Sequence, residues 1–110
     1  MARAVRWSGR ARSDLRAAVE YIRRDSPASA ARFLDKGLGA ARSLENFPDR
    51  GSVVEDLDDP DVRQLWIGRY RLLYEARDEA VWVLRVVHGS RDLLLALGKK
   101  SREDATGEEE

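Results

Sequence analysis

Two short stretches of the sequence carry the side chains best suited to chemistry, Gly68–Tyr74 (GRYRLLY) and Val87–Arg91 (VHGSR). Arginine holds and neutralises a phosphate through its planar fork of donors, and histidine moves protons near neutral pH. Together they suit the recognition or cleavage of a phosphodiester. They suit equally well a set of ion pairs with acidic groups of a protein partner. A lone histidine on a strand is also a common structural hydrogen-bonder, so the three interpretations stay open.

The strand pattern predicts where these side chains lie. If the turn between the last two strands centres on Asp78-Glu79, Arg71 lies opposite Val86 and Arg69 lies opposite His88. Alternation then places Arg69, Arg71 and His88 on one face, near Arg91. The other face collects Tyr70, Leu72, Tyr74, Val81, Val83 and Val87 for packing under helices. Arg85 interrupts this apolar face, so it must pair with an acid or extend to solvent, unless the register is shifted by one residue.

The sequence lacks the residues for most other kinds of catalytic or metal site. The chain has no cysteine and one histidine, which excludes disulfides, a thiolate nucleophile and a multi-histidine metal site within one chain. No glycine-rich phosphate loop and no nucleophile elbow is present. The acidic segment Asp56–Asp61 lacks the glycine and glutamate of a calcium loop and contains Pro60, so we expect a solvated turn. We therefore expect no cofactor and no metal.

The elements that must position these side chains follow from periodicity. Apolar residues recur at helical spacing in the first half of the chain and alternate in the second. Ser8 and Ser26 are placed as helix N-caps, and Pro27 as the first residue of the second helix. The expected elements are a strand Ala4–Trp7, a helix Arg10–Asp25, a helix from Pro27 to about Asn46, a weak strand Ser52–Asp56, strands Val62–Ile67, Tyr70–Ala76 and Val81–His88, and a short helix Arg91–Leu97. This order predicts an α+β fold, with an N-terminal strand and an antiparallel helical hairpin packed on a small antiparallel sheet.

Length and charge bound the remaining possibilities. The 110 residues, 20 basic and 20 acidic, support one domain, which we expect over residues 1–98. Residues 99–110 contain one alanine as their only hydrophobic residue and end in three glutamates, which predicts an acidic disordered tail. No apolar run is longer than that of Leu93–Leu97, which is too short to span a membrane, and no signal peptide is recognisable. We expect a cytoplasmic protein with no membrane contact.

Several motifs in a fixed order resemble the RelE/ParE superfamily of toxins from bacterial type II toxin–antitoxin systems. They span roughly residues 3–97: Trp7-Ser8, Ala11, Asp14-Leu15, Tyr21-Ile22, Asp25-Ser26-Pro27, Ala30-Ala31-Arg32-Phe33, Leu44, Phe47-Pro48, Gly51, Val62-Arg63-Gln64-Leu65, Gly68–Tyr74 and His88–Arg91. The resemblance implies the same helical hairpin on a sheet. It also implies a cognate antitoxin as partner. The toxin is then expected either as a homo-oligomer or in a hetero-oligomer with the antitoxin.

The resemblance implies one of two cellular targets. RelE-type members cut messenger RNA in the ribosomal A site, and ParE-type members poison DNA gyrase. The arginines that RelE-type cleavage uses match Arg71 and Arg91, with His88 beside them, but the tyrosine of the RelE-type C-terminal helix is Leu97 here. The strand Val62–Ile67 also offers only Arg63 where basic lysines are expected. These departures count against RNA cleavage, and the long, Ala-rich second helix and the pattern Val62-Arg63-Gln64-Leu65 resemble the ParE branch more closely.

These observations predict a ParE-like toxin that is not itself an enzyme. We expect the antitoxin's C-terminal segment to wrap the helical hairpin and the sheet edge, with Arg63, Arg69, Arg71, His88 and Arg91 as candidate residues for binding the antitoxin or the target. The alternatives are a ribosome-dependent mRNA endonuclease that uses Arg71, Arg91 and His88, or a non-toxic relative that retains antitoxin binding.

Overall fold

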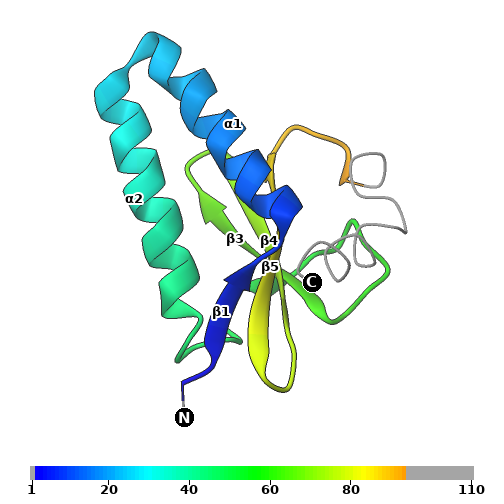
Figure 1. Ribbon diagram of the computed structural model, residues 1–110. Coiled ribbons are helices and arrows are strands. Elements are labelled where there is room, and N and C mark those ends of the chain that lie inside the picture. The colour runs from blue at the N-terminus through cyan, green and yellow to red at the C-terminus, as the bar shows by residue number, and fades with distance from the viewer. Residues whose placement is uncertain (1, 94–110) are drawn as a thin grey trace.

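The computed structural model describes residues 2–93. Two helices, α1 (Gly9–Asp25) and α2 (Pro27–Ser43), form a hairpin over one face of a five-stranded sheet (Figure 1). The strands are β1 (Ala4–Trp7), β2 (Ser52–Val53), β3 (Val62–Ile67), β4 (Tyr70–Ala76) and β5 (Ala80–His88), in the spatial order β1-β5-β4-β3-β2. The predicted α+β fold and its element order are confirmed.

Local signals explain where the helices begin. The Ser8 hydroxyl accepts a hydrogen bond from the Ala11 N–H, and the Ser26 hydroxyl accepts one from the Ser29 N–H, so both predicted caps are present. The second helix ends at Ser43, earlier than predicted, and the chain continues as a turn to Asn46. The weak strand is also shorter than predicted. The structure does not describe residues 94–110. Most of the predicted helix Arg91–Leu97 and the whole predicted tail 99–110 therefore lie outside the described residues.

The sheet is mixed, because β1 pairs with β5 in parallel while every other pair is antiparallel. After β1 the chain forms the helical hairpin and then enters the sheet again at its far edge with β2. Strands β3, β4 and β5 follow one beside the other, and β5 lies next to β1. Periodicity predicts strands but not which strand an N-terminal one joins, so the sequence indicated an antiparallel sheet throughout. None of the helices in residues 2–93 is long and apolar enough to cross a bilayer.

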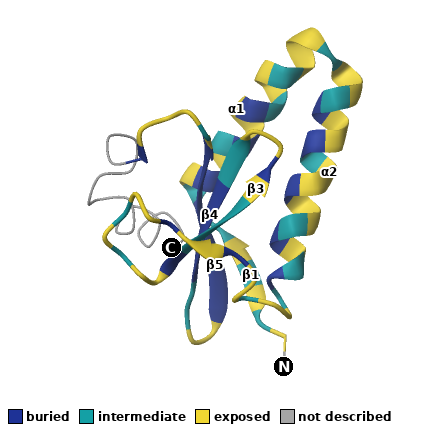
Figure 2. Ribbon diagram, turned by 180° about the vertical axis from the view of Figure 1, so that it is seen from behind, coloured by how far each residue is buried: buried dark blue, intermediate teal, exposed yellow. Residues whose placement is uncertain are grey.

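Apolar side chains pack on both faces of the sheet. The larger cluster lies between the sheet and the hairpin, and the dark blue buried positions of Figure 2 follow it along the helices and strands β4 and β5. Its buried members are Ala11, Leu15, Ala18, Phe33, Ala41, Leu44, Ile67, Leu72, Tyr74, Val81, Val83 and Val86. A smaller cluster covers the opposite face and consists of Val54, Val62, Leu73, Leu84, Val87 and Leu93.

A β-bulge in β5 changes the predicted register. Near the turn, Ala76 pairs with Val81 as predicted, but the pairing shifts by one residue between Leu73 and Tyr74. Beyond the shift Arg71 pairs with Val87, and Tyr70 pairs with His88. The predicted pairs of Arg71 with Val86 and of Arg69 with His88 are therefore wrong, because one extra residue in a strand turns all later side chains to the other face.

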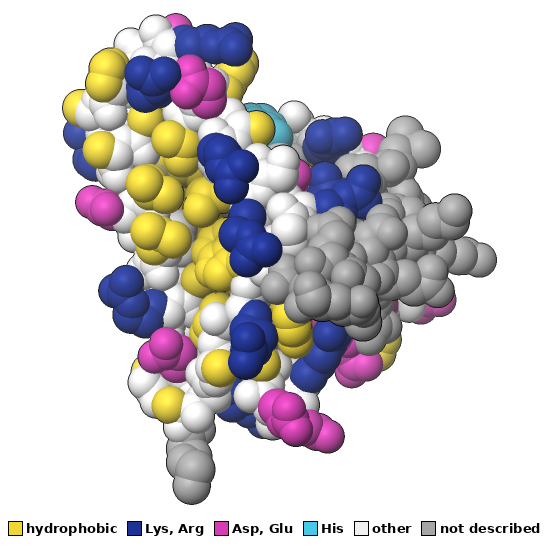
Figure 3. Space-filling view, in the orientation of Figure 1, with side chains coloured by type: hydrophobic (Ala, Val, Ile, Leu, Met, Phe, Trp, Pro, Cys, Tyr) yellow, Lys and Arg dark blue, Asp and Glu magenta, His cyan; other side chains and the backbone are white. Residues whose placement is uncertain are grey.

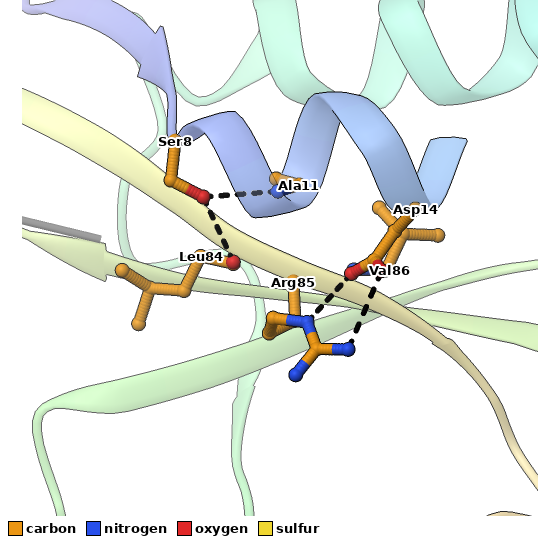
Figure 4. Close-up of polar contacts among 6 residues, drawn as sticks. All are labelled: Ser8, Ala11, Asp14, Leu84, Arg85 and Val86. Atoms are coloured by element: carbon orange, nitrogen blue, oxygen red, sulfur yellow. Dashed lines mark hydrogen bonds and ion pairs between the residues drawn. The ribbon is translucent and has the colours of Figure 1, made fainter. Parts of the chain in front are cut away.

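Helix α1 holds this bulge in place (Figure 4). The Ser8 hydroxyl donates to the Leu84 carbonyl at 3.0 Å. The Asp14 carboxylate accepts from the Arg85 Nε at 2.7 Å and from the Val86 N–H at 2.9 Å. Arg85 thus pairs with an acid, as predicted. Ser8 and Asp14 thus bind the Leu84 carbonyl and the Val86 N–H, two backbone groups beside the bulge that would otherwise need a neighbouring strand as partner.

Candidate functional site

Arg71 lies on the face of the sheet away from the helices and is held by its own chain. Its Nη1 lies 3.4 Å from the Gln64 Oε1 and 3.4 Å from the Asp56 Oδ1, and its Nη2 donates to the Gly89 carbonyl at 3.2 Å. The guanidinium also stacks over the Trp66 ring, 5.2 Å from the centroid. Only 14% of the side chain is exposed, and the buried Nε has no hydrogen-bond partner among residues 2–93. Little of this cation is left to hold a phosphate.

His88 lies on the opposite face, next to the helices. Its ring contacts Tyr70 edge to face at 5.1 Å between centroids, and Tyr70 in turn contacts Phe33 of α2 at 5.1 Å. The Ser90 N–H donates to the His88 Nδ1 at 3.1 Å, and the Ser90 hydroxyl lies 2.8 Å from the same nitrogen. The predicted common face of Arg69, Arg71 and His88 is therefore wrong, because Arg71 lies apart from the pocket that Arg69 and His88 line, and Val87 faces the smaller cluster instead.

The other predicted arginines are scattered. The Arg63 Nη1 donates to the Gly51 carbonyl at 2.7 Å and so secures the loop before β2. Arg69 occupies the turn between β3 and β4, where its carbonyl accepts from the Gly89 N–H at 2.8 Å and its side chain lines the same pocket as His88. Arg91 is exposed two residues beyond Gly89. The structure thus brings together Arg69 with His88, and separately Arg71 with the turn that leads to Arg91.

A larger concave surface, which the sequence pattern did not reveal, lies between the helices and β1. We call it the hairpin groove; its volume is about 610 Å³. Its floor is apolar and consists of Val5, Trp7, Leu15, Val19, Leu34 and Leu38. Three arginines also line it: Arg6, Arg12 and Arg16. Figure 3 shows this surface as yellow side chains bordered by a row of dark blue ones.

The sequence did contain a signal for this groove. Leu38 is 39% exposed although it belongs to the apolar stripe of α2, and Leu34 and Val19 are only partly buried. The helical stripes are therefore wider than the sheet can cover, which is typical of a surface that receives a partner. In residues 2–93 no three histidine, aspartate or glutamate side chains converge on a point where a metal ion could bind.

Three similarities to known proteins agree with this fold. The family model for the ParE toxin of the type II toxin–antitoxin system parDE matches residues 5–93. Toxin RelE2 of Caulobacter vibrioides is 35% identical over 88 residues, which cover 79% of this chain and 96% of that protein. A chain of the chromosomal ParDE toxin–antitoxin system from P. aeruginosa superposes with a TM-score of 0.64, over 78% of this chain and 95% of that chain. At 18% identity the last similarity concerns the fold alone.

Proposed function

The chain belongs to the ParE toxin family of type II toxin–antitoxin systems, and from this premise we propose that it acts in the cytoplasm by poisoning DNA gyrase. A toxin of such a system has an antitoxin as its partner. The gyrase target is the activity that the sequence resemblance implies for the ParE branch.

One observation supports a gyrase inhibitor over a nuclease: the β-bulge puts His88 and Arg71 on opposite faces of the sheet. Cleavage of a phosphodiester needs a cation at the phosphate and a proton-transfer group within hydrogen-bond reach of the reacting oxygens. Here the ring of His88 packs against Tyr70, and the guanidinium of Arg71 is engaged by Gln64 and Gly89. This arrangement favours a toxin that acts by binding.

The runner-up is a ribosome-dependent mRNA endonuclease. The relative that is 35% identical carries the name Toxin RelE2, which favours this alternative. In such an enzyme Arg71 and Arg91 would hold the RNA backbone, and His88 would act in proton transfer only after a rearrangement of β5. A third possibility is a non-toxic relative that still binds an antitoxin.

We further propose the hairpin groove as the binding site of the antitoxin. Its apolar floor suits the apolar face of an amphipathic segment, and Arg6, Arg12 and Arg16 suit acidic residues that border such a face. This moves the expected ion pairs from Arg63 and Arg71 to the arginines of the groove, and the exposed Arg91 stays a candidate. Arg63 is occupied by the carbonyl of Gly51, and Arg71 by that of Gly89.

Expression in a bacterial host without antitoxin tests the proposal. Growth, a DNA-damage reporter and total mRNA are followed together, and purified chain is added to a gyrase supercoiling and cleavage assay. Growth arrest with DNA damage, intact mRNA and trapped gyrase cleavage complexes is the expected result. Arrest with rapid loss of mRNA and no DNA damage would refute it in favour of the endonuclease, and no arrest would indicate the non-toxic relative.

Substitutions separate the first two mechanisms. Arg71→Ala with Arg91→Ala abolishes RNA cleavage by an endonuclease, whereas a gyrase contact made elsewhere survives. Arg24→Ala with Arg42→Ala removes the same charge from exposed helix positions and serves as control. Arg71 is mostly buried, so its replacement could disturb folding, whereas Arg91 is exposed. The single variant Arg91→Ala therefore tests RNA cleavage without this complication. A folded double variant that still arrests growth and damages DNA makes the endonuclease untenable.

A further inference from the structure

A second concavity lies at the tip of the helical hairpin, where α1 and α2 meet the turn between β3 and β4. We call it the tip pocket; its volume is about 400 Å³, within the range of sites for small ligands. It lies on the helix side of the sheet, apart from Arg71 and from the hairpin groove. Figure 3 shows its one histidine, in cyan, beside the hairpin.

The walls of the tip pocket combine rings with positive charge. Tyr21 of α1, Phe33 of α2, and Tyr70 and His88 of the sheet supply four rings. Arg32 and Lys36 of α2 lie one helical turn apart on one side, and Arg69 lies on the other. No aspartate or glutamate is among the residues that line the pocket. The charges therefore suit an anion, and the rings suit a planar group.

One of the rings, Tyr21, is open to a flat ligand. Phe33 and Tyr70 are already packed edge to face, and Tyr70 packs on His88. Tyr21 is 64% exposed and contacts no other ring of residues 2–93. Burial and the nearby Tyr21 raise the pKa of Tyr70, so its hydroxyl keeps its proton and can donate a hydrogen bond.

Backbone geometry leaves room for a ligand at the edge of the tip pocket. Gly68 has a φ of +59°, and a Cβ added there would meet nothing within 4 Å. The chain can thus come close to a bound group without a side chain in between. A concavity of this size suits a compact ligand, whereas an acidic peptide would need an extended groove or an open strand edge.

We propose that the tip pocket binds a nucleotide, with its phosphate between Arg32, Lys36 and Arg69 and its base stacked on Tyr21. The nucleotide is free or is an unpaired residue of a single strand, since both present the same chemistry. Aromatic stacking with cations at the phosphate is how proteins bind single-stranded nucleic acid without reading its sequence. This site is separate from the face that carries Arg71, and it does not depend on the cellular target proposed above.

Fluorescence anisotropy of the full chain with a 5′-fluorescein-labelled oligothymidine tests this site. Tyr21→Ala should weaken binding roughly 5- to 150-fold, because it removes one stacking platform. Tyr21→Phe keeps the ring and should bind as the unsubstituted chain does. Tyr21 is exposed, so neither variant should change the thermal unfolding midpoint by more than about 4 °C.

The charges are tested by salt dependence. Arg32→Gln with Lys36→Gln should reduce the slope of log affinity against log salt by roughly 0.7 for each phosphate that these side chains no longer neutralise. The control, Arg24→Gln with Arg42→Gln, removes equal charge from exposed positions of α1 and α2 outside the tip pocket and should leave the slope unchanged.

Competition with thymidine monophosphate distinguishes a single nucleotide from a strand, and either outcome supports the site as long as binding depends on Tyr21. The proposal is overturned if the oligonucleotide does not bind, if Tyr21→Ala binds as tightly as the unsubstituted chain, or if both double variants reduce the slope equally. It is also overturned if an acidic peptide binds more tightly than the oligonucleotide with the same dependence on Tyr21.

Discussion

Replacement of Asp14 by alanine should strongly destabilise the fold, because this carboxylate connects α1 to the bulge of β5. It accepts from the Arg85 Nε at 2.7 Å and from the Val86 N–H at 2.9 Å. The Arg85 side chain is 8% exposed and that of Asp14 is 18% exposed, so the pair is mostly shielded from water. Removal of one partner from a buried pair costs about 3–5 kcal/mol.

The partial exposure of Asp14 lowers this figure, and the unsatisfied Val86 N–H adds about 1 kcal/mol. We therefore expect a loss of about 3 kcal/mol in the free energy of unfolding, or about 12–24 °C in Tm for a domain of this size. Asp14→Asn keeps an acceptor for the N–H and should lose about half as much. Arg85→Met removes the buried cation itself and should cost about 1–2 kcal/mol.

Urea denaturation of the single variants and of the double variant Asp14→Ala with Arg85→Met measures the coupling. The double variant should lose at least about 1 kcal/mol less than the sum of the single losses, because each single change removes the same ion pair. Additive losses, or a change below about 0.5 kcal/mol for Asp14→Ala, would refute the view that this ion pair holds helix and bulge together.

Three further outcomes are expected. Tyr74→Phe removes a hydroxyl that donates to the Pro48 carbonyl at 2.7 Å and accepts from the Gly51 N–H at 2.9 Å, and should cost about 1–3 kcal/mol of unfolding free energy. Burial raises the Tyr74 pKa above 10.0, so its contribution to the free energy of unfolding is complete below pH 10 and is lost as the pH rises through the folded pKa. Unfolding followed by circular dichroism at a series of pH values should show this decrease, and the phenylalanine variant should show a smaller one. Gly51→Ala should lower Tm, because its Cβ would lie 2.6 Å from a carbonyl of β3, while Gly39→Ala, with open space around it, should raise Tm slightly; equal shifts would contradict this packing. In calorimetric titration with the antitoxin, Leu38→Lys should weaken binding at least about 10-fold, whereas Phe47→Lys, an equally drastic change of an exposed apolar residue outside the hairpin groove, should not.

Short-range signals in the sequence determined the elements and their order. Ser8 and Ser26 cap their helices through hydroxyls that reach only three residues ahead, so neighbours in the chain suffice to predict them. The two-residue connection Gly68-Arg69 suits a hairpin, and Gly68 supplies the positive φ. Motifs in fixed order were sufficient to indicate the toxin superfamily. Alternation also indicated that Arg85 either pairs with an acid, extends to solvent or marks a shifted register, and the structure shows both the acid partner and the shift.

Only the tertiary structure decided which functional side chains share a face. The bulge in β5 depends on Asp14, which lies 71 residues before Arg85, so no local pattern could reveal it. The single extra residue turns His88 toward Tyr70 and away from Arg71, which separates the predicted phosphodiester site. The hairpin groove and the tip pocket likewise arise where distant elements meet. Local physics sets periodicity and caps, whereas register and concave surfaces depend on contacts between segments far apart in the chain.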